Sequence, residues 1–266
     1  MQSQHTPGRL DISVRGRAGH VVIDNPSRRN AMSLSMWAAL SEALDRFADD
    51  PAVSCIVLRG AGDTAFCAGA DISEFDSARS GEDANREYER VTGEALERLR
   101  RCHKPTIAVI SGYCIGGGLA LALACDLRIA AIGSSYAVPA GRLGIGYDGT
   151  TLRRIAALAG PAQAKRMLFL ANRLTADEAL AIGLIEELIP PDGLDAAAKA
   201  LVGAIAANAP LSLAAGKAEI DLVHGQANEA DREAAAARTR ACQLSIDFLE
   251  GQRAFREKRP PAFTGQ

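Results

Sequence analysis

The chain has 266 residues, of which 48% are hydrophobic and 23% are charged, and its formal net charge is −2. This length and composition predict a globular protein with one large domain. The near-neutral charge gives no electrostatic basis for binding nucleic acid or an anionic membrane. The four histidines lack the spacing of metal ligands, so no metal is expected. The six cysteines form no CxxC pair, which indicates reduced core thiols in a cytoplasmic protein.

The N-terminal quarter predicts a hairpin, a helix and a strand. Two strands, Leu10–Val14 and His20–Asp24, flank a turn that contains glycine. Ser33 can cap a helix over Leu34–Ala48, because the apolar residues of that segment fall on one helical face. Val53–Arg59 is apolar at nearly every position, as expected for a strand that is covered on both sides.

A loop over Gly60–Asp71 follows, then a short turn near 72–75 and a predicted helix over Glu82–Arg101. The next segment, Thr106–Ile110, is rich in β-branched residues and is bounded by proline and glycine. It therefore predicts a buried strand, followed by a turn at Ser111–Tyr113.

Three glycines at 116–118 then open a helix of small apolar residues over Leu119–Ala124. Glycine lets another main chain or a ligand approach closely, and the unpaired amides at a helix N-terminus favour a negative oxygen. Close packing between helix and strand is an equally good interpretation of these glycines taken alone.

The rest of the chain continues the alternation of strands and helices and then becomes wholly helical. The predicted elements are strands at Leu127–Ala131, Tyr136–Val138 and Leu184–Ile189, a loop at Gly141–Gly149, and helices near 150–159, 161–170, 175–182, 193–207, 210–223 and 228–250. This order predicts an α/β core over 1–192 and a C-terminal helical region over 193–266. The apolar stripe of that region must cover the core or another subunit.

Two of the predicted loops follow two strands of the expected parallel sheet. One ends in Ala68-Gly69-Ala70, and the other contains the glycines at 116–118. Because such loops emerge at the same sheet edge, one backbone N–H from each can point at a single oxygen, as in an oxyanion hole. Cys67 and Cys114 flank this place, but no histidine partner is evident, so packing is their better interpretation.

Five segments, in order and at family spacing, resemble the crotonase superfamily, in particular the enoyl-CoA hydratase/isomerase family. They are NPSRRNAMS at 25–33, AFCAGADI at 65–72, KPTIAVISGYCIGGGLALALACDLRIAA at 104–131, AKRMLFLANRLTADEALAIGLIEELIP at 164–190 and EGQRAFREKRPPAF at 250–263. The resemblance implies a spiral of β-β-α turns whose C-terminal helices assemble a homotrimer or homohexamer. It also implies an acyl-CoA substrate, with coenzyme A as part of the thioester and no tightly bound cofactor.

The resemblance assigns roles to residues at matching positions. The backbone amides of Ala70 and Gly117 would hold the thioester carbonyl oxygen, and Ala68 would contact the CoA adenine. Arg28 would lie near the CoA phosphates, and Lys258 would reach the nucleotide of the same or a neighbouring subunit. A solvated surface charge is the alternative interpretation of both basic residues.

The sequence departs from the family pattern where hydratases carry two glutamates. Ala120 stands at the first position and Ala140, after Pro139, at the second. Hydration of an enoyl thioester needs a base for water and an acid for the α-carbon, and alanine supplies neither. Both alanines are expected in the substrate pocket, and ordinary hydratase chemistry is in doubt.

The remaining candidates lie in the loop before the helix near 150. Asp148 falls where some crotonase-like isomerases carry an acidic base and 4-chlorobenzoyl-CoA dehalogenases carry a nucleophilic aspartate. Its alternative role is the N-cap of the following helix. Tyr147 can donate a proton or hold a carboxylate, or simply form an aromatic wall. Arg142 is expected to pair with Asp148 or with an acidic acyl group.

Double-bond isomerisation through an enolate demands least of these residues, because one base can remove and return the same proton. Hydratase-like chemistry, decarboxylation and thioester hydrolysis with non-standard residues remain alternatives, and so does a non-catalytic acyl-CoA binding protein. The pocket wall is expected from the 72–100 region, but the acyl group itself is not predicted.

Overall fold

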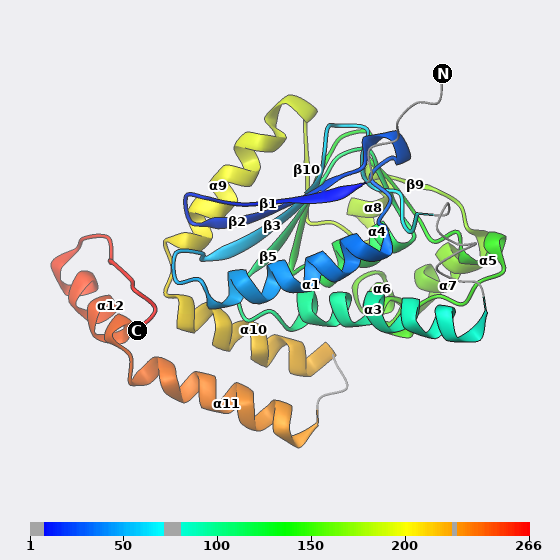
Figure 1. Cartoon of the computed structure of the whole chain (residues 1–266). Helices are drawn as coiled ribbons and strands as arrows, with labels where there is room; N and C mark the ends of the chain where they lie inside the picture. The colour runs from blue at the N-terminus through cyan, green and yellow to red at the C-terminus, as the bar shows by residue number, and fades with distance from the viewer. Residues whose placement is uncertain (1–7, 72–80, 225–227) are drawn as a thin grey trace.

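The computed structural model describes residues 8–71, 81–224 and 228–266, and Figure 1 shows the arrangement of its elements. The turn expected near 72–75 lies outside the described residues. In the described part of the chain, ten strands form two sheets. The larger sheet has the order β1 (Arg9–Arg15), β2 (Ala18–Asp24), β3 (Cys55–Gly60), β5 (Thr106–Ile110), β7 (Leu127–Ala131) and β10 (Glu187–Ile189). The smaller sheet has the order β4 (Ala65–Cys67), β6 (Tyr113–Ile115), β8 (Ser135–Ala137) and β9 (Leu174–Thr175).

The two sheets are built from a repeated β-β-α unit. In each repeat, the first strand joins the large sheet, the second joins the small sheet, and a helix leads to the next repeat. The three repeats are β3-β4-α3 (α3, Glu82–Arg101), β5-β6-α4 (α4, Gly117–Ala124) and β7-β8-α5 (α5, Ala140–Leu143). The parallel pairing of β3 with β5 and of β5 with β7 keeps the repeats in register. The predicted spiral of β-β-α turns is therefore confirmed.

The central strands β3, β5 and β7 of the large sheet are buried on both faces, as their apolar runs require. In β3, Cys55 and Val57 point to the face covered by α9 (Leu194–Ala206), whereas Ile56 and Leu58 point to the main core. The main core also contains buried residues of α1 (Leu34–Asp49), α3 and α4. The predicted cap of α1 is formed, because the Ser33 hydroxyl accepts a hydrogen bond from Met36 N at 3.3 Å.

Several predicted elements need correction in their bounds. The loop expected at Gly141–Gly149 begins with α5, which ends at Gly144 in the left-handed conformation with φ 65°. The segment expected as a turn at Ser111–Tyr113 leads directly into β6, and the loop expected at Gly60–Asp71 contains β4. The other helices around this region are η1 (Pro26–Arg28), α6 (Gly149–Ala159), α7 (Pro161–Leu170), α8 (Ala176–Ala181) and η3 (Pro191–Gly193).

Of the C-terminal helices, α10 (Pro210–His224) is tied to the core by the ion pair of Lys217 with Asp126, whereas α11 (Glu229–Gln243) and α12 (Ile246–Glu257) lie farther from the sheets in Figure 1. The single helix predicted over 228–250 is wrong, because α11 ends at Gln243 and Ser245 caps a new helix by accepting from Phe248 N at 3.0 Å. Of the described helices, none alone has the length and apolar composition to cross a bilayer. The segments Pro191–Ala206 and Pro210–Val223 meet that measure only jointly, across a 101° bend.

Candidate active site

The two turns predicted to converge do meet, by way of the small sheet. Ala68-Gly69-Ala70 follows β4 directly, and Gly116-Gly117 follows β6. Since β4 and β6 are parallel neighbours, both turns emerge at the same edge. The two turns were predicted to follow β3 and β5 directly, but β4 and β6 intervene and bring them together.

The main chains of these turns touch, and glycine makes this approach possible. A Cβ atom placed on Gly117 would lie 3.6 Å from the Ala70 nitrogen, and one placed on Gly69 would lie 3.4 Å from the Gly117 nitrogen. At Gly118 a Cβ atom would lie only 2.0 Å from the Cys67 carbonyl oxygen, a steric overlap that excludes any side chain at this position. The residue types at these positions therefore bring the two amides together.

Both amides point away from the surrounding protein. Met32 accepts from Asp71 N at 2.9 Å and donates to the Gly69 carbonyl at 2.8 Å, so the Ala70 N–H between them faces the other way. Gly117 is the first residue of α4, and its N–H has no partner inside the helix. Within the described chain, neither amide donates a hydrogen bond to the protein. Both residues are half-buried, so a ligand can reach them.

The amides lie on the wall of a cleft of about 680 Å³. Its lining includes Ala68, Gly69, Ala70, Gly116, Gly117, Ala120, Pro139, Ala140, Tyr147 and Asp148. Ala120 and Ala140, at the two positions where the resemblance leads one to expect glutamates, are both on this lining. Their methyl groups leave the cleft without a carboxylate at those two positions.

Asp148 is the N-cap of α6 and lines the cleft as well. Its carboxylate accepts from Thr151 N at 2.6 Å, from Thr151 Oγ1 at 2.7 Å and from Thr150 N at 3.2 Å. Both interpretations of this residue therefore fit its position. The Asp148 residue is exposed in the single chain.

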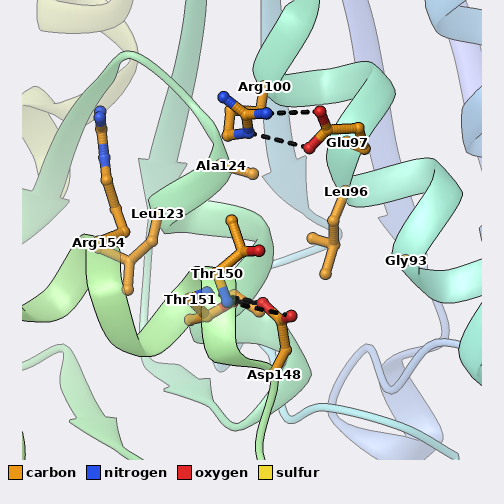
Figure 2. Close-up of a pocket in the computed structure, with 11 residues that line it drawn as sticks. Gly93, Leu96, Glu97, Arg100, Leu123, Ala124, Asp148, Thr150, Thr151 and Arg154 are labelled. Atoms are coloured by element: carbon orange, nitrogen blue, oxygen red, sulfur yellow. Dashed lines mark hydrogen bonds and ion pairs between the residues drawn. The ribbon is translucent and has the colours of Figure 1, made fainter. Parts of the chain in front are cut away.

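A small chamber of about 60 Å³ adjoins the cleft beyond Asp148. Figure 2 shows Asp148 and the two threonines on one side, Gly93 and Leu96 of α3 on another, and the Glu97–Arg100 ion pair near the opposite end. The Arg100 Nε donates to Glu97 at 3.0 Å, so this charged pair is internally matched. Cleft and chamber share Gly93, Leu96, Ala120 and Asp148 on their walls.

Tyr147 lines the cleft, as its interpretation as an aromatic wall requires, whereas Arg142 lies elsewhere. The Tyr147 hydroxyl donates to the Gly116 carbonyl oxygen at 2.7 Å, so its proton is engaged with the main chain. Burial, followed by the nearby Cys114 and Asp148, raises the pKa of Tyr147 well above its usual range. Arg142 donates to the Leu170 carbonyl and to Asn172 Oδ1 and is not on the cleft lining. The predicted pairing of Arg142 with Asp148 is therefore wrong for the described chain.

The two basic residues assigned to CoA lie in different places. Arg28 forms an ion pair of 3.1 Å with Asp71, next to Ala70, and so lies near the cleft. Lys258 is the exposed C-cap of α12, on the opposite side of the molecule from α5 in Figure 1. A contact from a neighbouring subunit remains a prediction for Lys258.

The pocket wall was predicted from the 72–100 region without individual residues, and α3 supplies them. One face of α3 lines the cleft with Asn85, Tyr88, Glu89, Thr92, Gly93 and Leu96. Their spacing of three and four residues is the signal that was available. Glu89 adds a second carboxylate to the cleft and accepts from Asn85 Nδ2 at 2.9 Å.

Cys67 and Cys114 are buried in the core. Burial raises the pKa of Cys67 to about 12 and that of Cys114 well above its usual value, so both thiols stay protonated at neutral pH. The described residues include no group of three or more His, Cys, Asp or Glu side chains that could hold a metal ion.

Comparisons with known proteins show which family the chain is similar to. The model of the family described as enoyl-CoA hydratase/isomerase matches residues 17–266. A crotonyl-CoA hydratase of Syntrophomonas wolfei is 34% identical over 249 residues, covering 91% of this chain and 92% of that protein. A carnitinyl-CoA dehydratase of Proteus mirabilis is 33% identical over 265 residues, covering 97% and 98%.

Among solved structures, an enoyl-CoA hydratase/carnithine racemase of Magnetospirillum magneticum superposes with a TM-score of 0.90 at 36% identity. That alignment covers 97% of this chain and 96% of the other. Sequence and fold thus agree over nearly the whole length. The chain belongs to the enoyl-CoA hydratase/isomerase family of the crotonase superfamily.

Proposed function

We propose that this protein binds an acyl-CoA thioester and stabilises its enolate between the backbone amides of Ala70 and Gly117. The observation that carries the proposal is the meeting of these two amides, neither paired within the described chain, on one wall of the cleft. Amides that are already oriented toward developing negative charge lower the barrier without reorganising, and each donor contributes roughly 3 kcal/mol. Such a pair suits any reaction that passes through a thioester enolate.

In this proposal Asp148 transfers the proton. A carboxylate offers about four acceptor sites, and the cap of α6 uses three of them. The fourth remains for a substrate C–H, while the cap bonds fix the orientation of the group. Capping and proton transfer are therefore compatible in one residue.

The reaction proposed is migration of a double bond from 3-enoyl-CoA to 2-enoyl-CoA. Asp148 takes a proton from C2, and the electron pair of that bond moves toward the thioester carbonyl, whose oxygen receives the two amide hydrogen bonds. The same proton then returns to C4 from Asp148, which restores the carboxylate. One base is sufficient for this sequence, and Ala120 and Ala140 leave no carboxylate at the two other positions.

Hydration or dehydration is the second candidate, because relatives of this chain are named crotonyl-CoA hydratase and carnitinyl-CoA dehydratase. It needs a water molecule held near C3 and a second acid or base in addition to Asp148. Glu89 is the other carboxylate on the described part of the cleft lining. A Glu89→Gln variant that loses hydration and keeps isomerisation would favour this candidate for the water-adding reaction.

The test of the isomerase proposal compares Asp148→Asn with Asp148→Ala. Asparagine preserves the helix cap, whereas alanine removes it at a cost of about 1 kcal/mol. Asp148→Asn is expected to keep the wild-type melting temperature and to lose about 100-fold or more in isomerisation, the size of a general-base contribution. Unchanged turnover of 3-enoyl-CoA in a folded Asp148→Asn variant would contradict the assignment.

The same proposal includes coenzyme A as part of the substrate and an assembly of three or six subunits. Support for assembly comes from large apolar side chains exposed on the C-terminal helices of the single chain, among them Val223, Leu249 and Phe255. Burying such side chains between subunits would stabilise an oligomer.

A further inference from the structure

The Tyr147 hydroxyl is bonded to the peptide unit that carries the Gly117 amide. The hydroxyl donates to the Gly116 carbonyl oxygen at 2.7 Å. The Gly116 carbonyl and the Gly117 N–H belong to one planar trans peptide, in which they point in opposite directions. A group that holds the carbonyl therefore also sets the direction of the N–H.

The Gly116–Gly117 peptide lies between two glycines, whose backbone is conformationally free, so a hydrogen bond that fixes its orientation matters here. Gly116 has φ 54° and ψ −120°, a conformation open to glycine, and it is flanked by a second glycine. Its carbonyl accepts a second hydrogen bond from Ala120 N at 3.0 Å, and its own N–H donates to the Ala137 carbonyl at 2.9 Å. The Ala120 bond comes from α4 itself, whereas the Tyr147 bond comes from the separate loop that precedes α6.

A hydrogen bond to the carbonyl also changes the amide electronically. Donation to the oxygen polarises the peptide, so the N–H on the same unit becomes a stronger donor. Burial raises the pKa of Tyr147, so the phenol keeps its proton, and hence the donated bond, through neutral and moderately alkaline pH. The same bond leaves the hydroxyl proton unavailable for transfer to the substrate.

We infer that Tyr147 is a positioning residue of the oxyanion hole: its hydroxyl orients and polarises the Gly116–Gly117 peptide so that the Gly117 N–H meets the thioester oxygen. This inference rests on the proposed function, because it needs a thioester carbonyl at that amide. It assigns Tyr147 neither the proton transfer nor the role of a passive aromatic wall.

The test uses Tyr147→Phe, which retains the ring and removes the hydroxyl. Tyr136→Phe is the matched control, because the Tyr136 hydroxyl is also buried, bonds to Ser134 Oγ at 2.8 Å and is not on the cleft lining. The probe is butyryl-CoA labelled with ¹³C at the thioester carbonyl, which has no double bond to migrate. Its bound ¹³C resonance reports how strongly the carbonyl is polarised.

In the wild type the bound carbonyl resonance is expected downfield of the free ester. Tyr147→Phe should remove a large part of that displacement. It should also lower kcat for the isomerisation of 3-enoyl-CoA about tenfold, the fold-change for loss of one hydrogen bond, with little change in KM. Tyr136→Phe should retain the wild-type resonance. An unchanged resonance in Tyr147→Phe, or an equal loss in Tyr136→Phe, would overturn the inference. A wild type without any downfield displacement would instead contradict the proposed oxyanion hole.

A second variant keeps the test decisive if Tyr147→Phe does not fold. Incorporation of 3,5-difluorotyrosine at position 147 preserves the shape of the ring and makes the hydroxyl a stronger donor. The bound carbonyl resonance is then expected to move further downfield than in the wild type. A resonance that stays in place or moves upfield would overturn the inference.

Discussion

The main chain of Gly69 lies directly against that of Gly117: a Cβ atom placed on Gly117 would be 3.5 Å from the Gly69 Cα. That distance is an ordinary van der Waals contact, so a methyl group fits there. The added methyl group would, however, lie 3.6 Å from the Ala70 nitrogen, in the space proposed for the thioester oxygen. The fold therefore tolerates an alanine at position 117, but its methyl group would obstruct binding of the thioester oxygen.

The first prediction contrasts two neighbouring glycines of α4. Gly117→Ala should change the free energy of unfolding by less than about 1 kcal/mol and lower kcat/KM about 100-fold, as when an oxyanion donor is lost. Gly118→Ala should destabilise the fold by about 1–3 kcal/mol, since its methyl would lie 2.0 Å from the Cys67 carbonyl. Thermal unfolding and steady-state kinetics on both variants separate the effects. Full activity in Gly117→Ala would argue against the oxyanion assignment.

The second prediction concerns Arg28 and the CoA phosphates. Arg28→Ala should raise KM for an acyl-CoA about tenfold through loss of a charge-assisted hydrogen bond, but should leave KM unchanged for the N-acetylcysteamine thioester, which has no nucleotide. Arg9→Ala, which removes a surface guanidinium paired with Asp11, is the control. Equal effects on both thioesters would mean that Arg28 acts only through its ion pair with Asp71.

The third prediction tests assembly. Light scattering should give the wild type three or six times the mass of the 27.9 kDa chain. Phe255 on α12 is 87% exposed and lines an apolar cavity of about 590 Å³ together with Phe248 and Phe263. Phe255→Ser should therefore weaken the oligomer, whereas Val14→Ser on β1 should not. A wild-type mass of one chain would refute the assembly proposed here.

The fourth prediction is a pH dependence set by the C-terminal tail. Hydrogen bonds from Arg259 and from Ala262 N hold the pKa of Glu250 well below its usual 4.5. A carboxyl whose pKa is lowered by folding stabilises the fold above its unfolded-state pKa, and this stability is lost as the pH falls below about 4.5. Melting temperatures of the wild type and Glu250→Gln should differ most at neutral pH and converge in acid.

The control for that series is Glu257→Gln, which removes a more exposed partner of Arg259. Its melting temperature should stay close to the wild type at every pH, because exposed ion pairs contribute little. A constant gap between wild type and Glu250→Gln from pH 7 to pH 3 would show that ionisation of Glu250 does not support the tail.

The sequence predicts the elements whose signals are local. Thr106–Ile110 is a strand over the predicted residues, because its β-branched run is bounded on both sides by breakers. Ser33 caps α1 as expected, since an N-cap depends only on residues within one turn. The three-residue strands β4 and β6 were missed, because Ala65 pairs with Tyr113 across the fold and neither segment has a pattern of its own.

In the candidate site, too, residues within local motifs could be predicted, whereas contacts between distant residues could not. Ala70, Gly117 and Asp148 could be located from motifs and lie on one cleft. The bond from Tyr147 to Gly116 joins residues 31 positions apart and depends on how the loop after α5 packs, so no sequence pattern predicts it. Arg142 was misplaced for the same reason: α5 turns its side chain toward the end of α7 rather than toward Asp148.

A crystal structure of the protein with bound butyryl-CoA is the most direct measurement of the central claim. In that structure, the thioester carbonyl oxygen is expected to lie about 2.7–3.1 Å from both the Ala70 and the Gly117 nitrogens. It also predicts that the acyl chain points toward Asp148. A thioester oxygen that contacts only one of these amides or neither, or an acyl chain outside the cleft, would contradict the account.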